Sequence, residues 1–99
     1  MKWKLYKTII GTISTTVPNN FSELHIVVSN LSFGSRYAYT IPKESLSNDI
    51  VYYTAGGYWA SDNYHGCYLG VSLNKVKLTS LVGSLKDFTN EATISIYYR

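Results

Sequence analysis

The chain has 99 residues and a formal net charge of +3. A chain of this length forms one domain, residues 1–99, and its core is thin because a small domain buries only about 60% of the surface that its unfolded chain exposes. The lysines and arginines form no dense basic stripe, which argues against nucleic acid as a partner. The sequence contains no run of about 18 apolar residues, so membrane insertion is not predicted. No secretory signal peptide is visible.

Two strand patterns open the chain. The first runs from Trp3 to Ile10 and stops at Gly11. The second runs from Thr12 to Val17 with alternate residues on one face. It stops at Pro18, because proline lacks the amide hydrogen that a strand ladder requires. We therefore expect two short strands in this part of the chain.

The next two strands form a predicted hairpin. Apolar and more polar side chains alternate from Glu23 to Leu31, and the return strand runs from Arg36 to Ile41. Between them, Gly34 can adopt the positive φ of a tight connection. Pro42 ends the return strand. The segment from Lys43 to Asn48 then predicts one helical turn, because a proline fits the first turn of a helix.

The middle of the chain predicts a tight turn between two extended segments. The segment from Asp49 to Thr54 is strand-like, and Ala55-Gly56-Gly57 is expected to form the turn. Tyr58-Trp59-Ala60 then leads into a polar loop from Ser61 to Tyr64.

Three further strand patterns complete the chain. The segment from His65 to Leu73 contains the only cysteine, Cys67, in phase with its apolar residues. We therefore expect a small buried side chain that forms no internal disulfide. A strand from Lys75 to Leu81 and a loop from Val82 to Asn90 follow. The last strand, from Ala92 to Arg99, alternates regularly to the end of the chain, which predicts a position near the centre of a sheet.

Short strands recur about every 8 to 12 residues, and no segment has a helical period. About eight or nine short strands in one small domain favour an all-β fold, a compact antiparallel β-sandwich of jelly-roll-like type.

No catalytic, cofactor or metal site is predicted, and the chain is interpreted as non-enzymatic. His25 and His65 are forty residues apart, and neither has a metal-ligand spacing to an acidic residue or to Cys67. His65 and Cys67 are two positions apart in a strand, about 7 Å, which is too far for a hydrogen-bonded nucleophile pair. His25 lies on the face opposite Leu24 and is expected to be exposed. The acidic residues show no pairing typical of glycosidases.

The richest group of polar and aromatic side chains surrounds the predicted middle hairpin. Aromatic rings stack on sugars while carboxylate and amide groups bond sugar hydroxyls, so the group could bind a host cell-surface glycan. Tyrosine and tryptophan are equally common anchors of protein contacts. Cross-strand aromatic pairs also stabilise a hairpin without any ligand. All three interpretations stay open for the candidate residues Tyr52, Tyr53, Tyr58, Trp59, Asp62, Asn63, Tyr64 and His65.

A family resemblance covers most of the chain. It is carried by Trp3-Lys4-Leu5, Thr15-Thr16-Val17-Pro18, Phe21-Ser22-Glu23-Leu24, Tyr39-Thr40-Ile41-Pro42 and the segment from Ala92 to Arg99. These segments resemble small virion-associated proteins of tailed bacteriophages and of prophages of gut Gram-positive bacteria, and also the distal domains of phage tail-fibre or baseplate proteins. The ending from Ser95 to Arg99 is the most specific part. The resemblance supplies no catalytic or binding residue.

The resemblance implies a structural or receptor-binding role in a phage virion that is assembled in the bacterial host cytoplasm. The implied partners are copies of the same chain, in a homotrimer, or other virion proteins. A thin core agrees with this, because neighbouring subunits add the apolar burial that a small chain lacks. Two alternatives stay open: a capsid decoration protein that stabilises the head, and a monomeric carbohydrate-binding module.

Overall fold

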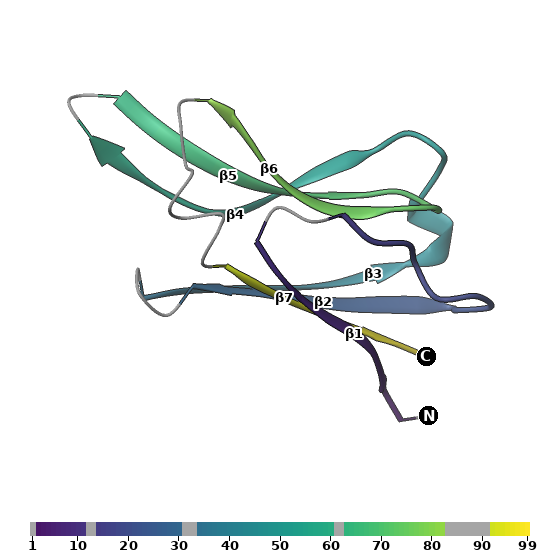
Figure 1. The fold of residues 1–99 in the computed structure, drawn as a ribbon. Coiled ribbons are helices and arrows are strands. Elements are labelled where there is room, and N and C mark those ends of the chain that lie inside the picture. Colours follow the sequence, from purple (N-terminus) through teal and green to yellow (C-terminus); the bar gives the residue numbers. More distant parts are fainter. Residues whose placement is uncertain (1, 12–13, 31–33, 61–62, 83–91) are drawn as a thin grey trace.

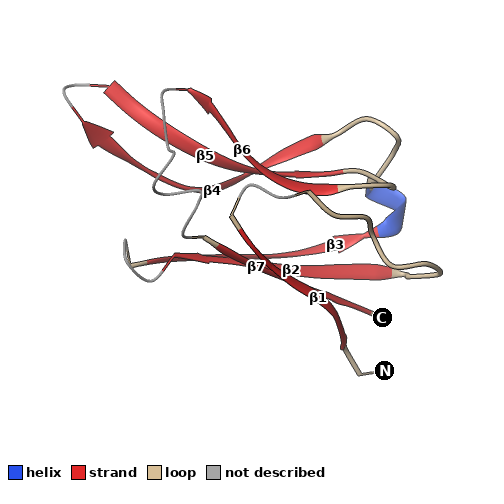
Figure 2. Ribbon diagram, viewed as in Figure 1, coloured by secondary structure: helices blue, strands red, loops and turns tan. Residues whose placement is uncertain are grey.

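The computed structural model consists of two antiparallel β-sheets that face one another (Figure 1; Figure 2). It describes residues 2–11, 14–30, 34–60, 63–82 and 92–99, with the backbone alone for residues 57–60, 63–65 and 80–82. Within these ranges the elements are β1 (Lys4–Ile10), β2 (Glu23–Asn30), β3 (Ser35–Pro42), the 3-10 helix η2 (Lys43–Ser45), β4 (Val51–Ala60), β5 (Asn63–Val71), β6 (Val76–Val82) and β7 (Thr93–Tyr98). The predicted all-β antiparallel sandwich is confirmed, with seven strands in the described part of the chain where the sequence predicted eight or nine.

The four-stranded sheet has the order β1-β7-β2-β3, so the last strand of the chain lies inside a sheet, as its alternation predicts. Burial alternates along β2, with Leu24, Ile26 and Val28 on the buried face. In β7, Ile94 and Ile96 are fully buried, and the register pairs them with Val28 and Ile26. Because paired residues share a face, these branched side chains form one continuous half of the core.

The three-stranded sheet has the order β4-β5-β6 and corrects the prediction for the middle of the chain. β4 runs through Ala55-Gly56-Gly57 without turning and ends at Ala60. Gly56 has a φ of 110°, and the register shifts after Thr54 before pairing resumes. The two glycines therefore form an irregularity of the β-bulge type inside one long strand. A glycine with positive φ suits a turn and a bulge equally, and only the pairing beyond it distinguishes them.

The predicted polar loop from Ser61 to Tyr64 is shorter than expected. Asn63 and Tyr64 belong to β5 and pair with Ala60 and Trp59. The pairing of the long β4 with β5 extends the hairpin into the segment that was assigned to the loop. Ser61 and Asp62 lie outside the described residues.

The second predicted strand, from Thr12 to Val17, is also corrected. In its described part, residues 14–17, Thr15 forms an isolated β-bridge with Val76 of β6, through backbone hydrogen bonds of 2.9 and 2.8 Å. The segment follows β1 of one sheet and meets β6 of the other. A segment that crosses between two sheets does not continue a ladder with either of them, so its alternation was misleading.

Two predicted turns are confirmed. Gly34 has a φ of 66° at the β2–β3 connection, whose residues 31–33 lie outside the described residues. The helical turn expected after Pro42 is η2.

The predicted loop from Val82 to Asn90 lies outside the described residues except for Val82, which ends β6. Among the described residues, no helix has the length and apolar character needed to cross a membrane.

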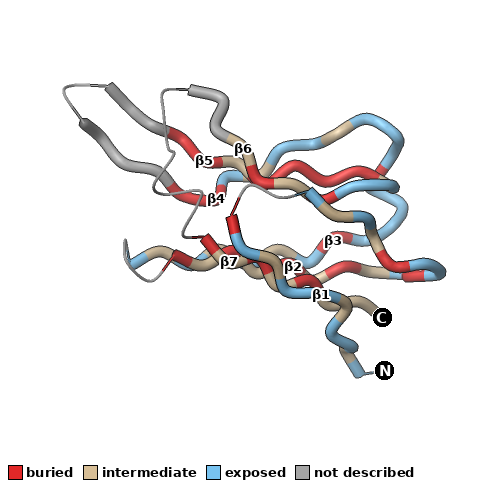
Figure 3. The backbone as a smooth tube through the Cα atoms, in the orientation of Figure 1, coloured by how far each residue is buried: buried red, intermediate tan, exposed pale blue. Residues whose placement is uncertain are grey.

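The core lies between the two sheets, where the buried positions of both sheets face each other (Figure 3). Both termini lie at the same end of the four-stranded sheet (Figure 1), in agreement with the pairing of Lys4 with Tyr98. Among the described residues, the hydrophobic core consists of Phe21, Leu24, Ile26, Val28, Ile41, Leu46, Ala55, Cys67, Leu69, Val71, Val76, Leu78, Ala92, Ile94 and Ile96.

Candidate functional site

Tyr52 and Tyr53, two neighbours of the predicted site, face opposite sides of the three-stranded sheet. Successive residues of a strand alternate between the two faces. Tyr52 is 42% exposed on the outer face. Tyr53 is half-buried and packs against Tyr39 of β3, with 5.0 Å between the ring centroids. The two tyrosines therefore belong to different surfaces.

The other predicted site residues lie on the β4–β5 hairpin. Tyr58 pairs with His65, Trp59 pairs with Tyr64, and Asn63 pairs with Ala60. The side chains of residues 57–60 and 63–65, and the whole of Asp62, lie outside the described part of the structure. The register thus brings four of the predicted aromatic and imidazole residues into cross-strand pairs on one hairpin.

Two tyrosine rings cover glycines on the outer face of the three-stranded sheet. A Cβ atom at Gly66 would lie 2.8 Å from both Cε2 and the hydroxyl of Tyr68. A Cβ atom at Gly70 would lie 2.9 Å from Cγ2 of Ile50 and 3.2 Å from Cε1 of Tyr52. The rings occupy the space that side chains at these β5 positions would need. The ammonium of Lys77 lies 6.0 Å from the centre of the Tyr52 ring. We call this outer surface the tyrosine platform: Tyr52, Tyr68, Gly66, Gly70 and Lys77.

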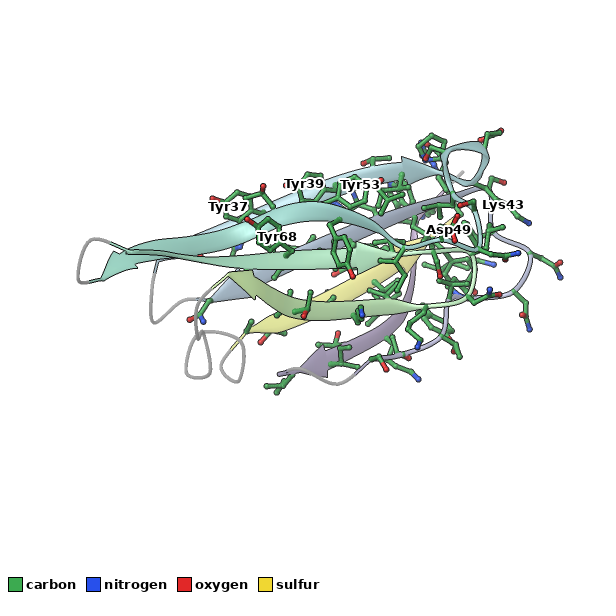
Figure 4. The ribbon with its side chains drawn as sticks, turned by 90° about the horizontal axis from the view of Figure 1, so that it is seen from above. Tyr37, Tyr39, Lys43, Asp49, Tyr53 and Tyr68 are labelled. Atoms are coloured by element: carbon green, nitrogen blue, oxygen red, sulfur yellow. The ribbon has the colours of Figure 1, made fainter. Side chains whose placement is uncertain are left out.

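A second group, the tyrosine row of Tyr37, Tyr39 and Tyr53, lies along the side of the sandwich where β3 and β4 are neighbours. Figure 4 shows the three residues in one line, with Tyr68 on the neighbouring surface of the three-stranded sheet. The hydroxyl of Tyr39 donates a hydrogen bond to the carbonyl of Thr54 and so connects the two sheets. Burial, and then the neighbouring Tyr37 and Tyr53, raise the pKa of Tyr39 above its ordinary value of 10.0.

A third group of aromatic residues lies on the outer face of the four-stranded sheet. The rings of Trp3 and Tyr97 lie 5.5 and 6.3 Å from the ring of His25. The guanidinium of Arg99 lies 4.2 Å from the centre of the Trp3 ring and forms a 2.8 Å ion pair with Glu23. His25 is consequently half-buried among rings, whereas the sequence predicted an exposed position.

The tyrosine row and the outer aromatic group were missed by sequence analysis. Alternation places Tyr37 and Tyr39 on the same side as Ile41, but it does not reveal that β4 brings Tyr53 to them. His25 and Tyr97 are far apart in the sequence and meet because β2 pairs with β7. The signal that could have found both groups is strand pairing, which alternation alone does not specify.

The potentially reactive groups among the described residues are buried or dispersed. Cys67 is fully buried, as predicted, and burial raises the pKa of its thiol to about 12 despite a hydrogen bond from the Tyr68 backbone. The thiol is therefore protonated at neutral pH, and a thiol is a weak nucleophile in that form. Nδ1 of His25 is 2.8 Å from the Thr40 hydroxyl. No group of three histidine, cysteine or acidic side chains that could hold a metal ion occurs in the described part of the chain.

Comparisons with known proteins identified no relative of this chain. No family model, no curated protein and no solved structure matches the chain.

Proposed function

We propose that this chain is a non-enzymatic virion-associated protein of a tailed phage, in which several copies assemble and display a receptor-binding surface of the tail-fibre type. The proposal starts from the sequence resemblance and is supported by the fold, because a two-sheet antiparallel domain suits repeated subunits in an assembly. The observation that carries it is the tyrosine platform, where ring surface is held on the outside of a sheet instead of in the core.

The platform has the composition of a binding surface. Tyrosine offers a broad apolar ring with a polar tip and is enriched where proteins contact partners. The Tyr52 ring rests over Gly70, and the glycine leaves room for it close to the backbone. A ring that is supported in this way loses little side-chain freedom when a partner binds, and a smaller entropy loss favours binding.

Particle fractionation and adsorption competition test the proposal. An antibody against the chain should detect it in purified phage particles, in the tail fraction. The purified protein should also block attachment of the phage to its host. Detection in the head fraction without competition would support capsid decoration instead, and absence from all particles would contradict a virion role.

A carbohydrate-binding module is the second candidate, favoured by one observation. The exposed Tyr52 ring has the Lys77 side chain beside it, so a stacking surface and a polar donor are adjacent. A glycan array distinguishes this candidate: Tyr52→Ala should abolish binding, while Val51→Ala, an equally exposed neighbour at 41%, should retain it. An array without any bound glycan would reject the module.

A further inference from the structure

Strand β3 is an open edge of the four-stranded sheet. It pairs with β2 along eight residues, from Ser35 to Pro42, without any register shift. No other described strand pairs with it. In an antiparallel ladder every second residue directs its amide and carbonyl away from the neighbouring strand. β3 therefore presents a regular row of backbone donors and acceptors to its open side, and such a row is a template for another strand.

The opposite edge of the same sheet, β1, has the features that prevent pairing. Its register shifts between Leu5 and Lys7, and the Lys7 ammonium lies 3.1 Å from the hydroxyl of Thr15. The hydroxyls of Tyr6 and Thr16 are 2.8 Å apart, so the segment that follows β1 folds back along it. A bulge, lysines and a covering segment are the usual protections of an edge strand.

β3 has few of these protections. Its register is unbroken, it contains no lysine, and Arg36 is its one charged residue. Pro42 lacks an amide hydrogen but stands at the end of the strand, where it leaves residues 35–41 free to pair. On the outer face of β3, Ala38 and Thr40 are exposed and small, so another strand can approach closely.

The surface beside the β3 edge is partly apolar. On β4, the neighbouring strand of the other sheet, Val51 and Tyr52 are 41% and 42% exposed. The hydrogen bond from Tyr39 to Thr54 holds β4 next to β3 on this side (Figure 4). Backbone pairing at β3 would thus be accompanied by burial of apolar and tyrosine surface, which is the composition of protein interfaces.

We propose that the occupant of this edge is β3 of a second copy, paired antiparallel about a two-fold axis near Ala38, so that two four-stranded sheets become one continuous sheet. Pairing about Ala38 sets Arg36 opposite Thr40 of the second copy, and pairing about Tyr39 sets it opposite Pro42. In neither register does Arg36 lie opposite Arg36 of the second copy. This favours the pairing, because like charges directly opposite each other destabilise a sheet. Antiparallel pairing of identical strands is two-fold by symmetry. A three-fold ring would require β3 to meet a different edge, and β1 is covered.

The inference deepens the proposed multimeric role and rests on it. Ala38→Lys is the test variant and Thr8→Lys is its matched control. Ala38 and Thr8 are both exposed and lie in the same cross-strand row, at the two opposite edges of one sheet. We expect the wild-type chain to form dimers in sedimentation equilibrium. Ala38→Lys should weaken the association by about tenfold or more through repulsion across the axis. Thr8→Lys should leave it unchanged, and circular dichroism should show intact sheets in both variants.

Mixing and cross-linking make the test specific to this edge. An equimolar mixture of Ala38→Lys and Ala38→Glu should recover the association that each variant loses alone. Because the native Cys67 is fully buried, Ala38→Cys provides an accessible thiol that should oxidise to a covalent dimer, while Thr8→Cys should form no covalent dimer. A wild-type multimer that is insensitive to Ala38→Lys would overturn the β3 inference and leave the proposed function standing. A wild-type chain that is monomeric at every concentration would overturn both the inference and the multimeric role.

Discussion

The two sheets differ in how they fill their surfaces. In the four-stranded sheet, the paired strands β2 and β7 bury aliphatic side chains in matching rows, such as Ile26 opposite Ile96. In the three-stranded sheet, the central strand β5 buries Cys67, Leu69 and Val71 on its inner face. It carries two glycines on its outer face: the Tyr68 ring covers Gly66, and Ile50 together with the Tyr52 ring covers Gly70. The packing of the four-stranded sheet therefore consists mainly of buried aliphatic side chains. The packing on the outer face of the three-stranded sheet consists of tyrosine rings that fit over glycines.

This difference predicts where substitutions are costly. A buried aliphatic residue in a central strand has partners on all sides, so its removal leaves a cavity. A ring on an outer face can move toward solvent, so changes beneath it cost less.

The largest expected effect is that of Ile96→Ala in the centre of the four-stranded sheet. Ile96 is fully buried in β7, between β1 and β2. The substitution should lower the free energy of unfolding by about 2–5 kcal/mol, measured by urea denaturation. Ile10→Ala is the control, because Ile10 is 62% exposed on β1. It should change stability by less than about 0.5 kcal/mol, and equal effects of the two substitutions would contradict the assigned core.

A smaller effect, with a change of sign, is expected beneath the Tyr68 ring. Gly66→Ala places a methyl group 2.8 Å from ring atoms of Tyr68 and should lower the free energy of unfolding by about 1 kcal/mol, the low end of the cost of overpacking, because the ring can move toward solvent. In a Tyr68→Ala background the same change should be neutral or stabilising by about 0.5 kcal/mol, because alanine costs less backbone entropy than glycine. Thermal denaturation of the wild type, the two single variants and the double variant measures the coupling. An equal cost in both backgrounds would mean that the ring does not occupy this space.

The hydrogen bond that connects the sheets gives a third prediction. Tyr39→Phe removes the hydroxyl that donates to the Thr54 carbonyl and should cost about 1 kcal/mol of stability. The folded-state pKa of Tyr39 is raised above 10.0, so its contribution is fully present below pH 10.0 and is lost as the pH rises through the raised value. Urea denaturation between neutral and alkaline pH should show a weaker loss of stability for the variant. If the variant lost as much stability at alkaline pH as the wild type does, that loss would have to come from groups other than Tyr39.

The smallest effect is expected for the ion pair between Glu23 and Arg99. Both side chains are about one-third exposed, so solvent screens the 2.8 Å contact. Glu23→Gln should lower the free energy of unfolding by about 0.5 kcal/mol at low salt. The difference from wild type should vanish near 1 M salt, where the Debye length is about 3 Å. A difference that persists at high salt would indicate a role beyond charge pairing.

Sequence analysis succeeded where one face of a strand is buried and the ladder is regular. The alternation of Leu24, Ile26 and Val28 predicted β2 correctly, and the alternation to the end of the chain predicted the interior position of β7. In both cases the pattern of side chains follows directly from burial on one face.

The sequence-based prediction was wrong where glycine is compatible with two structures. Gly56 and Gly57 were predicted to form a turn because glycine adopts positive φ there, yet they interrupt the register inside β4. Tyr52 was identified as a candidate site residue and is exposed, but Tyr68, whose ring lies over Gly66 on the same outer face, was not identified. Tyr39 meets Tyr53 only through the packing of two sheets, which no local pattern records.

The central claim about assembly is that β3 is a pairing edge and β1 is not. Hydrogen exchange measured against protein concentration tests it directly. We predict that every second amide of residues 35–41 gains protection at concentrations where multimers form, while amides of Lys4–Ile10 exchange at constant rates. Multimers that form without added protection in β3, or with protection gained in β1 instead, would contradict it.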